Sequence, residues 1–82
     1  MTMIQVEVVL YATLAEYVPG SKPGVPSVME LEEGKTVQEL LEMLGVPGND
    51  AKLIFINGVI KDPDCVLGDR DRVGIFPPVA GG

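Results

Sequence analysis

Apolar and polar side chains alternate along the first segment of the chain. Within residues 4–11, four apolar residues recur at every second position: Ile4, Val6, Val8 and Leu10. Gln5 and Glu7 lie between them, and a period of two is typical of a β-strand with one buried face. The alternation returns over residues 28–32, where Met29 and Leu31 are predicted to face inward and the intervening glutamates to face water. The pattern predicts two strands that pair with each other.

A helical pattern follows the second strand. Thr36 is a good N-cap residue and Glu39 stands three positions later, which is the spacing of a reciprocal capping box. Four apolar residues after the cap share one helical face: Val37, Leu40, Leu41 and Leu44. Gly45 suits the residue that follows a helix, and Pro47 prevents the helix from continuing. The chain is therefore predicted to carry one main helix, in addition to a short helix over residues 12–18.

Three further strand patterns complete the chain. Residues 52–56 are almost continuously apolar, which predicts an interior strand covered on both faces. Asn57-Gly58 is a strong two-residue hairpin signal, so residues 59–61 are predicted to form a short return strand. Residues 72–76 are predicted to be the last strand, and Pro77-Pro78 ends it because proline cannot donate a hydrogen bond to a strand ladder.

The order of these elements predicts the fold class. It runs strand, short helix, strand, capped helix, strand, hairpin and last strand, which favours an α+β domain. A mixed, mostly antiparallel sheet crossed by one main helix buries the apolar helix face most economically, with the first and last strands as neighbours in the middle. This is the β-grasp arrangement. We expect residues 1–76 to form the β-grasp domain and residues 77–82 a flexible C-terminal tail.

Composition restricts the classes of function. The chain has 82 residues, of which 46% are hydrophobic and 22% charged, as expected of one packed domain. Its formal net charge of -6 argues against nucleic acid and an anionic membrane surface as partners. The same charge favours a partner with a basic patch, or serves only solubility. No apolar run approaches the ~20 residues of a membrane span, and no signal peptide is recognisable. Cys65 is the only cysteine, so no disulfide can form within the chain. A cytoplasmic location is therefore expected.

The chain lacks the residues of self-contained catalysis. It has no histidine, which excludes Ser-His-Asp and Cys-His arrangements, and no Cys/His cluster suggests a zinc site. No glycine loop of the phosphate- or dinucleotide-binding kind is present, so we expect no cofactor bound by this chain. The four aspartates between residues 62 and 71 lack the spacing and the closing glutamate of an EF-hand, so no metal is expected either. Cys65 lies beside Val66 and Leu67 and is predicted to be a partly buried, unreactive thiol.

The last residues carry the most specific chemistry. The segment Ile75-Phe76-Pro77-Pro78-Val79-Ala80 leads into a terminal Gly81-Gly82. An α-carboxyl group has a pKa of roughly 3.5, so it is an anion near neutral pH and becomes a good acyl donor only once a nucleotide activates it. Two glycines without side chains could enter a narrow channel of a partner enzyme. The alternative is a frayed end or an expression remnant.

Phe76 has two interpretations. Val73 and Ile75 share the core face of the last strand, so Phe76 lies on the opposite side, beside the tail. It is expected either to contact a partner subunit together with Val79 or to pack against Tyr11 or the short helix. The tail could extend roughly 20 Å at ~3.3 Å per residue. The two prolines at its base restrict it and lower the cost of ordering it in a deep pocket.

Four segments resemble, in order and over nearly the whole chain, the small subunits of molybdopterin synthase. They are residues 10–14, residues 31–41, residues 56–58 and, most specifically, residues 69–82. Proteins of this family are ubiquitin-like β-grasp sulfur carriers, often grouped with the sulfur carrier of the thiamine pathway. Ala80 stands where many relatives have serine, and Ile75 replaces a frequent phenylalanine. Neither substitution touches the terminal glycine pair.

The resemblance implies a sequence of events at one carboxylate. An adenylyltransferase of the ubiquitin-activating type adenylates Gly82 with ATP and magnesium. Sulfur from a persulfide donor then displaces AMP, which converts Gly82 into a thiocarboxylate. The loaded tail enters the large catalytic subunit of molybdopterin synthase and delivers sulfur to a cyclic pterin precursor, which yields the dithiolene of the molybdenum (or tungsten) cofactor. Gly82 carries the reacting group, and Gly81 keeps the tail narrow because it has no side chain. The family forms a heterotetramer, and the residues expected to bind the partner are Phe76, Pro77, Pro78, Val79 and Ala80.

Three other functions fit the same sequence features. The chain could carry sulfur for another pathway, such as thiamine or cysteine synthesis. It could be a ubiquitin-like modifier conjugated to lysines on target proteins, since the fold and the two glycines allow this equally well. It could also be an interaction domain whose terminal glycines have no role. The Phe76-Pro77-Pro78 entry to the tail favours the molybdopterin pathway, in which the chain acts as the sulfur-donating subunit of a sulfurtransferase complex.

Overall fold

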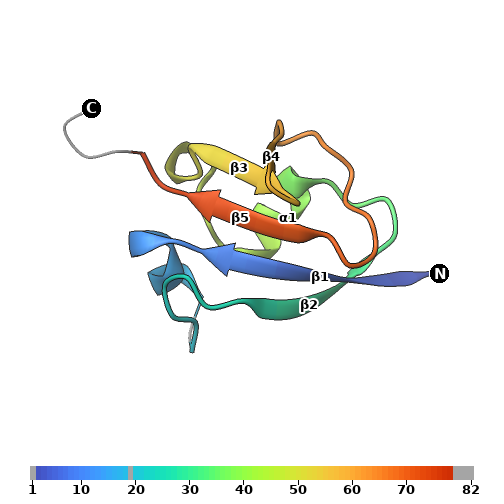
Figure 1. Cartoon of the computed structure of the whole chain (residues 1–82), viewed down its shortest axis with the longest axis horizontal. Coiled ribbons are helices and arrows are strands. Elements are labelled where there is room, and N and C mark those ends of the chain that lie inside the picture. Colours follow the sequence, from blue (N-terminus) through green and yellow to red (C-terminus); the bar gives the residue numbers. More distant parts are fainter. Residues whose placement is uncertain (1, 19, 79–82) are drawn as a thin grey trace.

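A mixed sheet of five strands forms the front of the molecule, and one α-helix lies behind it (Figure 1). The computed structural model describes residues 2–18 and 20–78. Its elements in chain order are β1 (Met3–Leu10), η1 (Ala12–Tyr17), β2 (Ser27–Glu32), α1 (Val37–Leu44), η2 (Gly48–Asp50), β3 (Leu53–Ile56), β4 (Val59–Ile60) and β5 (Arg72–Phe76). The labels η1 and η2 denote short 3-10 helices.

The strand order of the sheet is β2-β1-β5-β3-β4. The central pair, β1 and β5, is parallel, and the other three pairs are antiparallel. The first and last strands therefore lie side by side in the middle, as predicted. This arrangement, with one main helix across a mixed sheet, confirms the predicted α+β β-grasp fold.

The core fills the space between α1 and the rear face of the sheet. The residues of β1 that share one face are all buried, namely Ile4, Val6, Val8 and Leu10. The helix contributes Val37, Leu40 and Leu41, and η1 contributes Leu14 and Ala15. Burial of such apolar side chains is the main term that stabilises a domain of this size. None of the described core residues is charged or polar.

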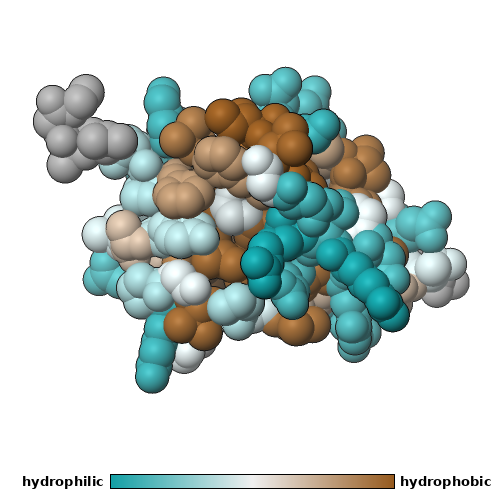
Figure 2. Space-filling model, viewed as in Figure 1, coloured by the Kyte–Doolittle hydropathy of each residue, from teal (hydrophilic) through white to brown (hydrophobic). Residues whose placement is uncertain are grey.

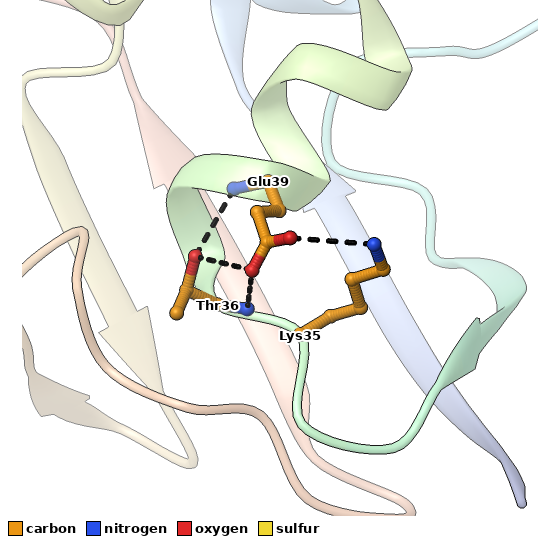
Figure 3. A network of polar contacts seen from close by, with 3 residues as sticks. All are labelled: Lys35, Thr36 and Glu39. Carbon is orange, nitrogen blue, oxygen red and sulfur yellow. Dashed lines mark hydrogen bonds and ion pairs between the residues drawn. The ribbon is translucent and has the colours of Figure 1, made fainter.

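The main helix has the predicted cap. The Thr36 hydroxyl accepts a hydrogen bond from the Glu39 backbone N–H at 3.2 Å, and the Glu39 carboxylate accepts one from the Thr36 backbone N–H at 3.1 Å (Figure 3). The Lys35 ammonium lies 3.3 Å from the same carboxylate. The hydrogen bond from the Thr36 N–H, with help from Lys35, lowers the pKa of Glu39. At the other end, Gly45 takes the left-handed conformation with φ +76°, which closes the helix.

The hairpin after β3 also forms as predicted. Asn57 and Gly58 both have positive φ, at 53° and 84°. Two successive residues with positive φ match a type I′ turn, whose twist suits paired strands. The return strand β4 is limited to Val59–Ile60.

One prediction about β3 is wrong. Ile54 and Ile56 are buried in the core, but Leu53 is 41% exposed and Phe55 is only half-buried. In the part of the chain that the structure describes, α1 covers only the rear face of the sheet, so β3 is covered on one face rather than two. The run is apolar throughout because Leu53 and Phe55 form a second apolar surface on the open face of the sheet.

Candidate partner-docking site

Three aromatic rings meet on the open face of the sheet, at the end where β5 stops. The Tyr11 and Phe76 rings are stacked, with centroids 4.1 Å apart and planes 4° apart. The Phe55 ring meets Phe76 edge to face at 5.4 Å. Aromatic pairs of this geometry stabilise a fold by more than the burial of their surface area alone. Phe76 thus packs against Tyr11, which was one of the two predicted interpretations, and part of its ring surface stays accessible.

Strand register brings these rings together. Leu53 lies opposite Phe76, and Phe55 lies opposite Gly74, so all four residues share the open face. Tyr11 follows β1 directly, and its N–H donates to the Ile75 carbonyl at 3.1 Å, which extends the parallel ladder by one residue.

Gly74 forms the floor of a shallow depression between the rings. A Cβ atom at this position would lie 3.5 Å from a ring carbon of Tyr11. The missing side chain leaves a depression of about 230 Å³ lined by Val9, Tyr11, Phe55, Gly58, Arg72, Gly74 and Phe76. Its lining is mostly apolar, so it suits an apolar side chain of another molecule.

The apolar surface continues beyond the depression. Leu53 is 41% exposed and Ile60, which lies opposite Phe55, is 62% exposed. We call the apolar patch the open-face surface formed by Tyr11, Leu53, Phe55, Ile60 and Phe76. Figure 2 shows apolar side chains gathered over β3 and β4 on this face, beside polar ones toward β1. Contiguous exposed apolar surface is typical of surfaces that bind other molecules, so this patch is a candidate docking site.

The patch lies directly before the predicted tail. The Phe76 carbonyl accepts a hydrogen bond from the Lys52 N–H at 2.9 Å, so the end of β5 is held in the sheet. Beyond it, Pro77 is half-buried and Pro78 is exposed. Among the residues expected to act or to bind a partner, four lie outside the described residues: Val79, Ala80, Gly81 and Gly82.

Other candidate residues have structural roles. Cys65 is half-buried against the core, as predicted. Asp71 accepts hydrogen bonds from the Gly68 N–H at 2.7 Å and from the Asn57 amide at 2.9 Å, so its carboxylate holds a turn. Within residues 2–18 and 20–78, no three His, Cys, Asp or Glu side chains are grouped as a metal site. No helix in this part of the chain has the length and apolar character needed to cross a membrane.

Sequence reasoning missed some contacts. Tyr11 and Phe55 were not assigned to a docking surface, although both fall at open-face positions of predicted strands. The Tyr17 hydroxyl donates a hydrogen bond to the Asp50 carboxylate and thereby links η1 to η2. This hydrogen bond raises the pKa of Tyr17. No sequence pattern indicates a contact between side chains 33 positions apart.

The sheet order, the crossing helix and the position of the last strand define the class of ubiquitin-like β-grasp proteins. The chain belongs to the ThiS family, whose model matches residues 8–82. It is a ubiquitin-like sulfur carrier of the ThiS type, and the predicted family resemblance is confirmed. A comparison with curated proteins found no match.

Solved structures support the same class. The solution structure of the HVO 2177 protein from Haloferax volcanii is 28% identical with a TM-score of 0.75, covering 98% of this chain and 88% of that one. SAMP1 from the same organism is 27% identical with a TM-score of 0.70, covering 95% and 99%. A protein from Pyrococcus furiosus assigned as subunit 1 of a molybdopterin converting factor is 28% identical with a TM-score of 0.70, covering 93% and 99%. A ubiquitin from Caldiarchaeum subterraneum, 16% identical with a TM-score of 0.59, shares the fold.

Proposed function

We propose that this chain is the sulfur-carrier small subunit of a molybdopterin synthase and carries sulfur as a thiocarboxylate on Gly82. The observation that carries the proposal is the stack of Tyr11 on Phe76, which places an exposed apolar patch directly before the sequence Pro77 to Gly82. A carrier needs such a surface, because its partner must grip the folded domain while the tail reaches a distant active site. The name of the Pyrococcus furiosus relative supports this pathway.

The proposed loading reaction uses one carboxylate. A carboxylate oxygen of Gly82 attacks the α-phosphorus of ATP, pyrophosphate leaves, and an acyl adenylate forms. The terminal sulfur of a persulfide attacks the acyl carbon and AMP leaves, which gives an acyl disulfide. A thiol reduces this bond and releases the thiocarboxylate together with a new disulfide. Adenylation replaces the poor leaving group of the carboxylate with AMP, which is a good one, and this allows sulfur to displace it in the next step.

The proposed transfer reaction consumes the loaded tail. The thiocarboxylate sulfur attacks a carbon of the pterin precursor and displaces an oxygen substituent from that carbon. Water then cleaves the bond between the acyl carbon and sulfur, so the sulfur stays on the precursor as a thiolate. The Gly82 carboxylate is regenerated and can be loaded again. Gly81 keeps the tail slim enough for a narrow channel.

Both reactions require partner proteins. This chain has no histidine, the most common general base, and the catalytic groups are proposed to come from these partners. The proposed partners are an adenylyltransferase of the ubiquitin-activating type, which uses ATP and magnesium, and the large subunit of the synthase, with which the chain forms a heterotetramer. The proposed site of action is the cytoplasm. Phe76, Pro77, Pro78, Val79 and Ala80 are proposed to line the contact with these partners.

A second function has support from one relative, for which two structures are solved. SAMP1 has been solved twice, and one structure names it small archaeal modifier protein 1 from H. volcanii, at 26% identity and a TM-score of 0.71. The same activated Gly82 would then be attacked by a lysine amine of a target protein. AMP would leave and an isopeptide bond would form. Delivery of sulfur to thiamine or cysteine synthesis would use the same loading chemistry with a different acceptor.

Intact-mass spectrometry tests the carrier function. The chain is incubated with the adenylyltransferase of its own genome, ATP, magnesium, a persulfide donor and a thiol. We expect a mass increase equal to the exchange of one oxygen for one sulfur. Deletion of Gly82 should abolish the increase, whereas Ala80→Ser, which introduces the serine of many relatives, should load like the original chain. Unchanged circular dichroism of both variants would show that the fold is intact.

The same experiment separates the alternatives. A ladder of larger conjugates in cell extract would favour the modifier. Loading of the Gly82 deletion would contradict the proposed mechanism. For the pathway, the loaded carrier is mixed with the large subunit and the pterin precursor, and formation of molybdopterin is measured. A carrier that loads but yields no molybdopterin in this assay belongs to another pathway.

A further inference from the structure

The side chain of Asn57, at the tip of the β3–β4 hairpin, joins that hairpin to the start of β5. Its amide N–H donates a hydrogen bond to the Asp71 carboxylate at 2.9 Å, and its amide oxygen accepts one from the Arg72 N–H at 3.1 Å. The Asn57 backbone N–H donates to the Arg72 carbonyl at 2.9 Å. An asparagine side chain has both donors and an acceptor, and Asn57 uses both kinds of group at once.

Asp71 is itself held in place by other parts of the chain. Its second carboxylate oxygen accepts a hydrogen bond from the Gly68 N–H at 2.7 Å. Its backbone carbonyl accepts one from the Glu7 N–H at 2.9 Å, which ties it to β1. We call the hydrogen bonds among Asn57, Gly68, Asp71 and Arg72 the hairpin network. The network therefore fixes the direction in which the Asn57 amide points.

The residue after Asn57 gives this amide a reactive neighbour. Gly58 has no side chain, so its backbone nitrogen can approach the Asn57 side chain closely. When this nitrogen attacks the amide carbon, a new C–N bond forms, the bond to the amide nitrogen breaks and ammonia leaves with the Gly58 N–H proton. The product is a five-membered succinimide. Water then opens either carbonyl of the ring and leaves an aspartate or an isoaspartate, and no group is oxidised or reduced.

We propose that Asn57 is a site of deamidation and that its hydrogen bond to Asp71 protects it. Asn57 is exposed, so water can reach it. To react, however, the amide must turn toward the Gly58 nitrogen, whereas the hairpin network directs it toward Asp71 and Arg72. The reaction therefore proceeds from a locally opened hairpin rather than from the closed one. This inference does not depend on the sulfur-carrier function.

Deamidation would prevent the network from closing again. The product has two oxygens where Asn57 has an oxygen and an N–H donor, so an oxygen faces the Asp71 carboxylate whichever way the side chain turns. Two carboxylates in contact repel each other. An isoaspartate also lengthens the backbone of a two-residue turn that depends on the positive φ angles of Asn57 and Gly58. The modification is thus a one-way change that weakens the link between the hairpin and β5.

Peptide mapping can follow the reaction at each asparagine of the chain. Trypsin cleaves after lysine, so Asn49 is recovered in the peptide of residues 36–52 and Asn57 in the peptide of residues 53–61. Samples are kept in warm, mildly alkaline buffer for several weeks. Mass spectrometry of the two peptides then measures the exchange of an amide NH2 for OH. The original chain is incubated both folded and unfolded in urea.

Two variants test the protective hydrogen bond. Asp71→Ala removes the acceptor of the Asn57 amide, and Asp69→Ala is the matched control because the Asp69 carboxylate accepts from the Gln5 N–H instead. We expect Asp71→Ala to deamidate at Asn57 about threefold to tenfold faster than the folded original chain, because one hydrogen bond less favours the opened hairpin. Asp69→Ala should stay within about twofold of the original chain. In urea, the original chain should react faster at Asn57 than at Asn49, which precedes Asp50 rather than glycine.

Each part of the inference has a result that overturns it. Equal rates at Asn57 in Asp71→Ala and Asp69→Ala overturn the protective role of Asp71. Equal rates in the folded and the unfolded original chain overturn protection by the fold, and this comparison decides the matter if circular dichroism shows that Asp71→Ala does not fold. An unfolded chain that reacts as fast at Asn49 as at Asn57 overturns the assignment of the site.

The structural consequence is tested with the aspartate product itself. Asn57→Asp should unfold at a lower urea concentration than the original chain, because its new carboxylate faces Asp71. Asn49→Asp adds the same charge at an exposed position in η2 and controls for net charge. Equal urea midpoints of the two variants would show that deamidation leaves the hairpin network intact.

Discussion

Gly74 stands in the middle of β5, where a glycine weakens a strand by roughly 0.5–1 kcal/mol relative to alanine. A Cβ at this position would meet Tyr11 at 3.5 Å and Phe55 at 3.9 Å, which are ordinary contact distances. Nothing in the fold therefore requires glycine here. The missing side chain matters instead for the depression between the aromatic rings, which an alanine would partly fill.

Gly74→Ala should therefore change stability and binding in opposite directions. We expect the free energy of unfolding to rise by about 0.5–1 kcal/mol, measured by chemical denaturation. The affinity for the adenylyltransferase should fall by about 1–3 kcal/mol if the patch contacts that partner as proposed, because the added methyl would overpack the depression. Gly48→Ala is the matched control, since its Cβ would meet only Gln38 at 3.9 Å, outside the patch. Equal affinity of the Gly74→Ala variant would show that the depression does not receive a partner.

At the scale of elements, the formation of α1 depends on packing against the sheet and on hydrogen bonds at its first turn. It has eight residues, fewer than an isolated helix needs to form in water. Its three buried residues pack on the sheet, while Thr36 and Glu39 satisfy N–H groups that the first turn leaves without partners. Packing holds the helix in place, and the cap determines where it begins.

Thr36→Ala should destabilise the domain by about 1 kcal/mol, because the Glu39 N–H loses its acceptor. The free energy of unfolding from urea denaturation measures this change. Thr13→Ala serves as the control, since Thr13 is exposed in η1 and should change stability by less than ~0.5 kcal/mol. Equal losses in the two variants would mean that the capping hydrogen bond adds nothing.

The pH dependence of stability should report on Glu39. The Thr36 N–H and Lys35 lower its pKa in the folded protein below the usual value of 4.5. The unfolded chain thus binds this proton more readily, so the contribution of Glu39 is complete above pH 4.5 and is lost as the pH falls through the lower folded value. Glu39→Gln should accordingly lose less unfolding free energy than the original chain between neutral pH and pH 3, measured by urea denaturation across that range. Parallel pH profiles of the two proteins would contradict the assignment.

At the scale of the whole molecule, local signals predicted more than long-range ones. The capping box, the Asn57-Gly58 turn and the strand ending at Phe76 each depend on neighbours in sequence, and each formed as predicted. The apolar run in β3 was misread, because a run of hydrophobic residues does not tell which face another element covers. The Tyr11–Phe76 stack depends on the parallel register of β1 and β5, which no short motif encodes.

The domain has one core, so a single deep truncation should affect all of it. Leu40 is fully buried beneath the sheet, whereas Met43 on the same helix is 55% exposed. Leu40→Ala should lower the free energy of unfolding by about 2–5 kcal/mol, a large part of the ~5–15 kcal/mol that stabilises a natural domain. Met43→Ala should change it by less than ~0.5 kcal/mol. Thermal and chemical unfolding should remain a single transition in both variants, because β1, β5 and α1 share that core. A second transition that leaves the sheet folded would show that the helix and the sheet are separable, and the open face could then bind a partner without α1.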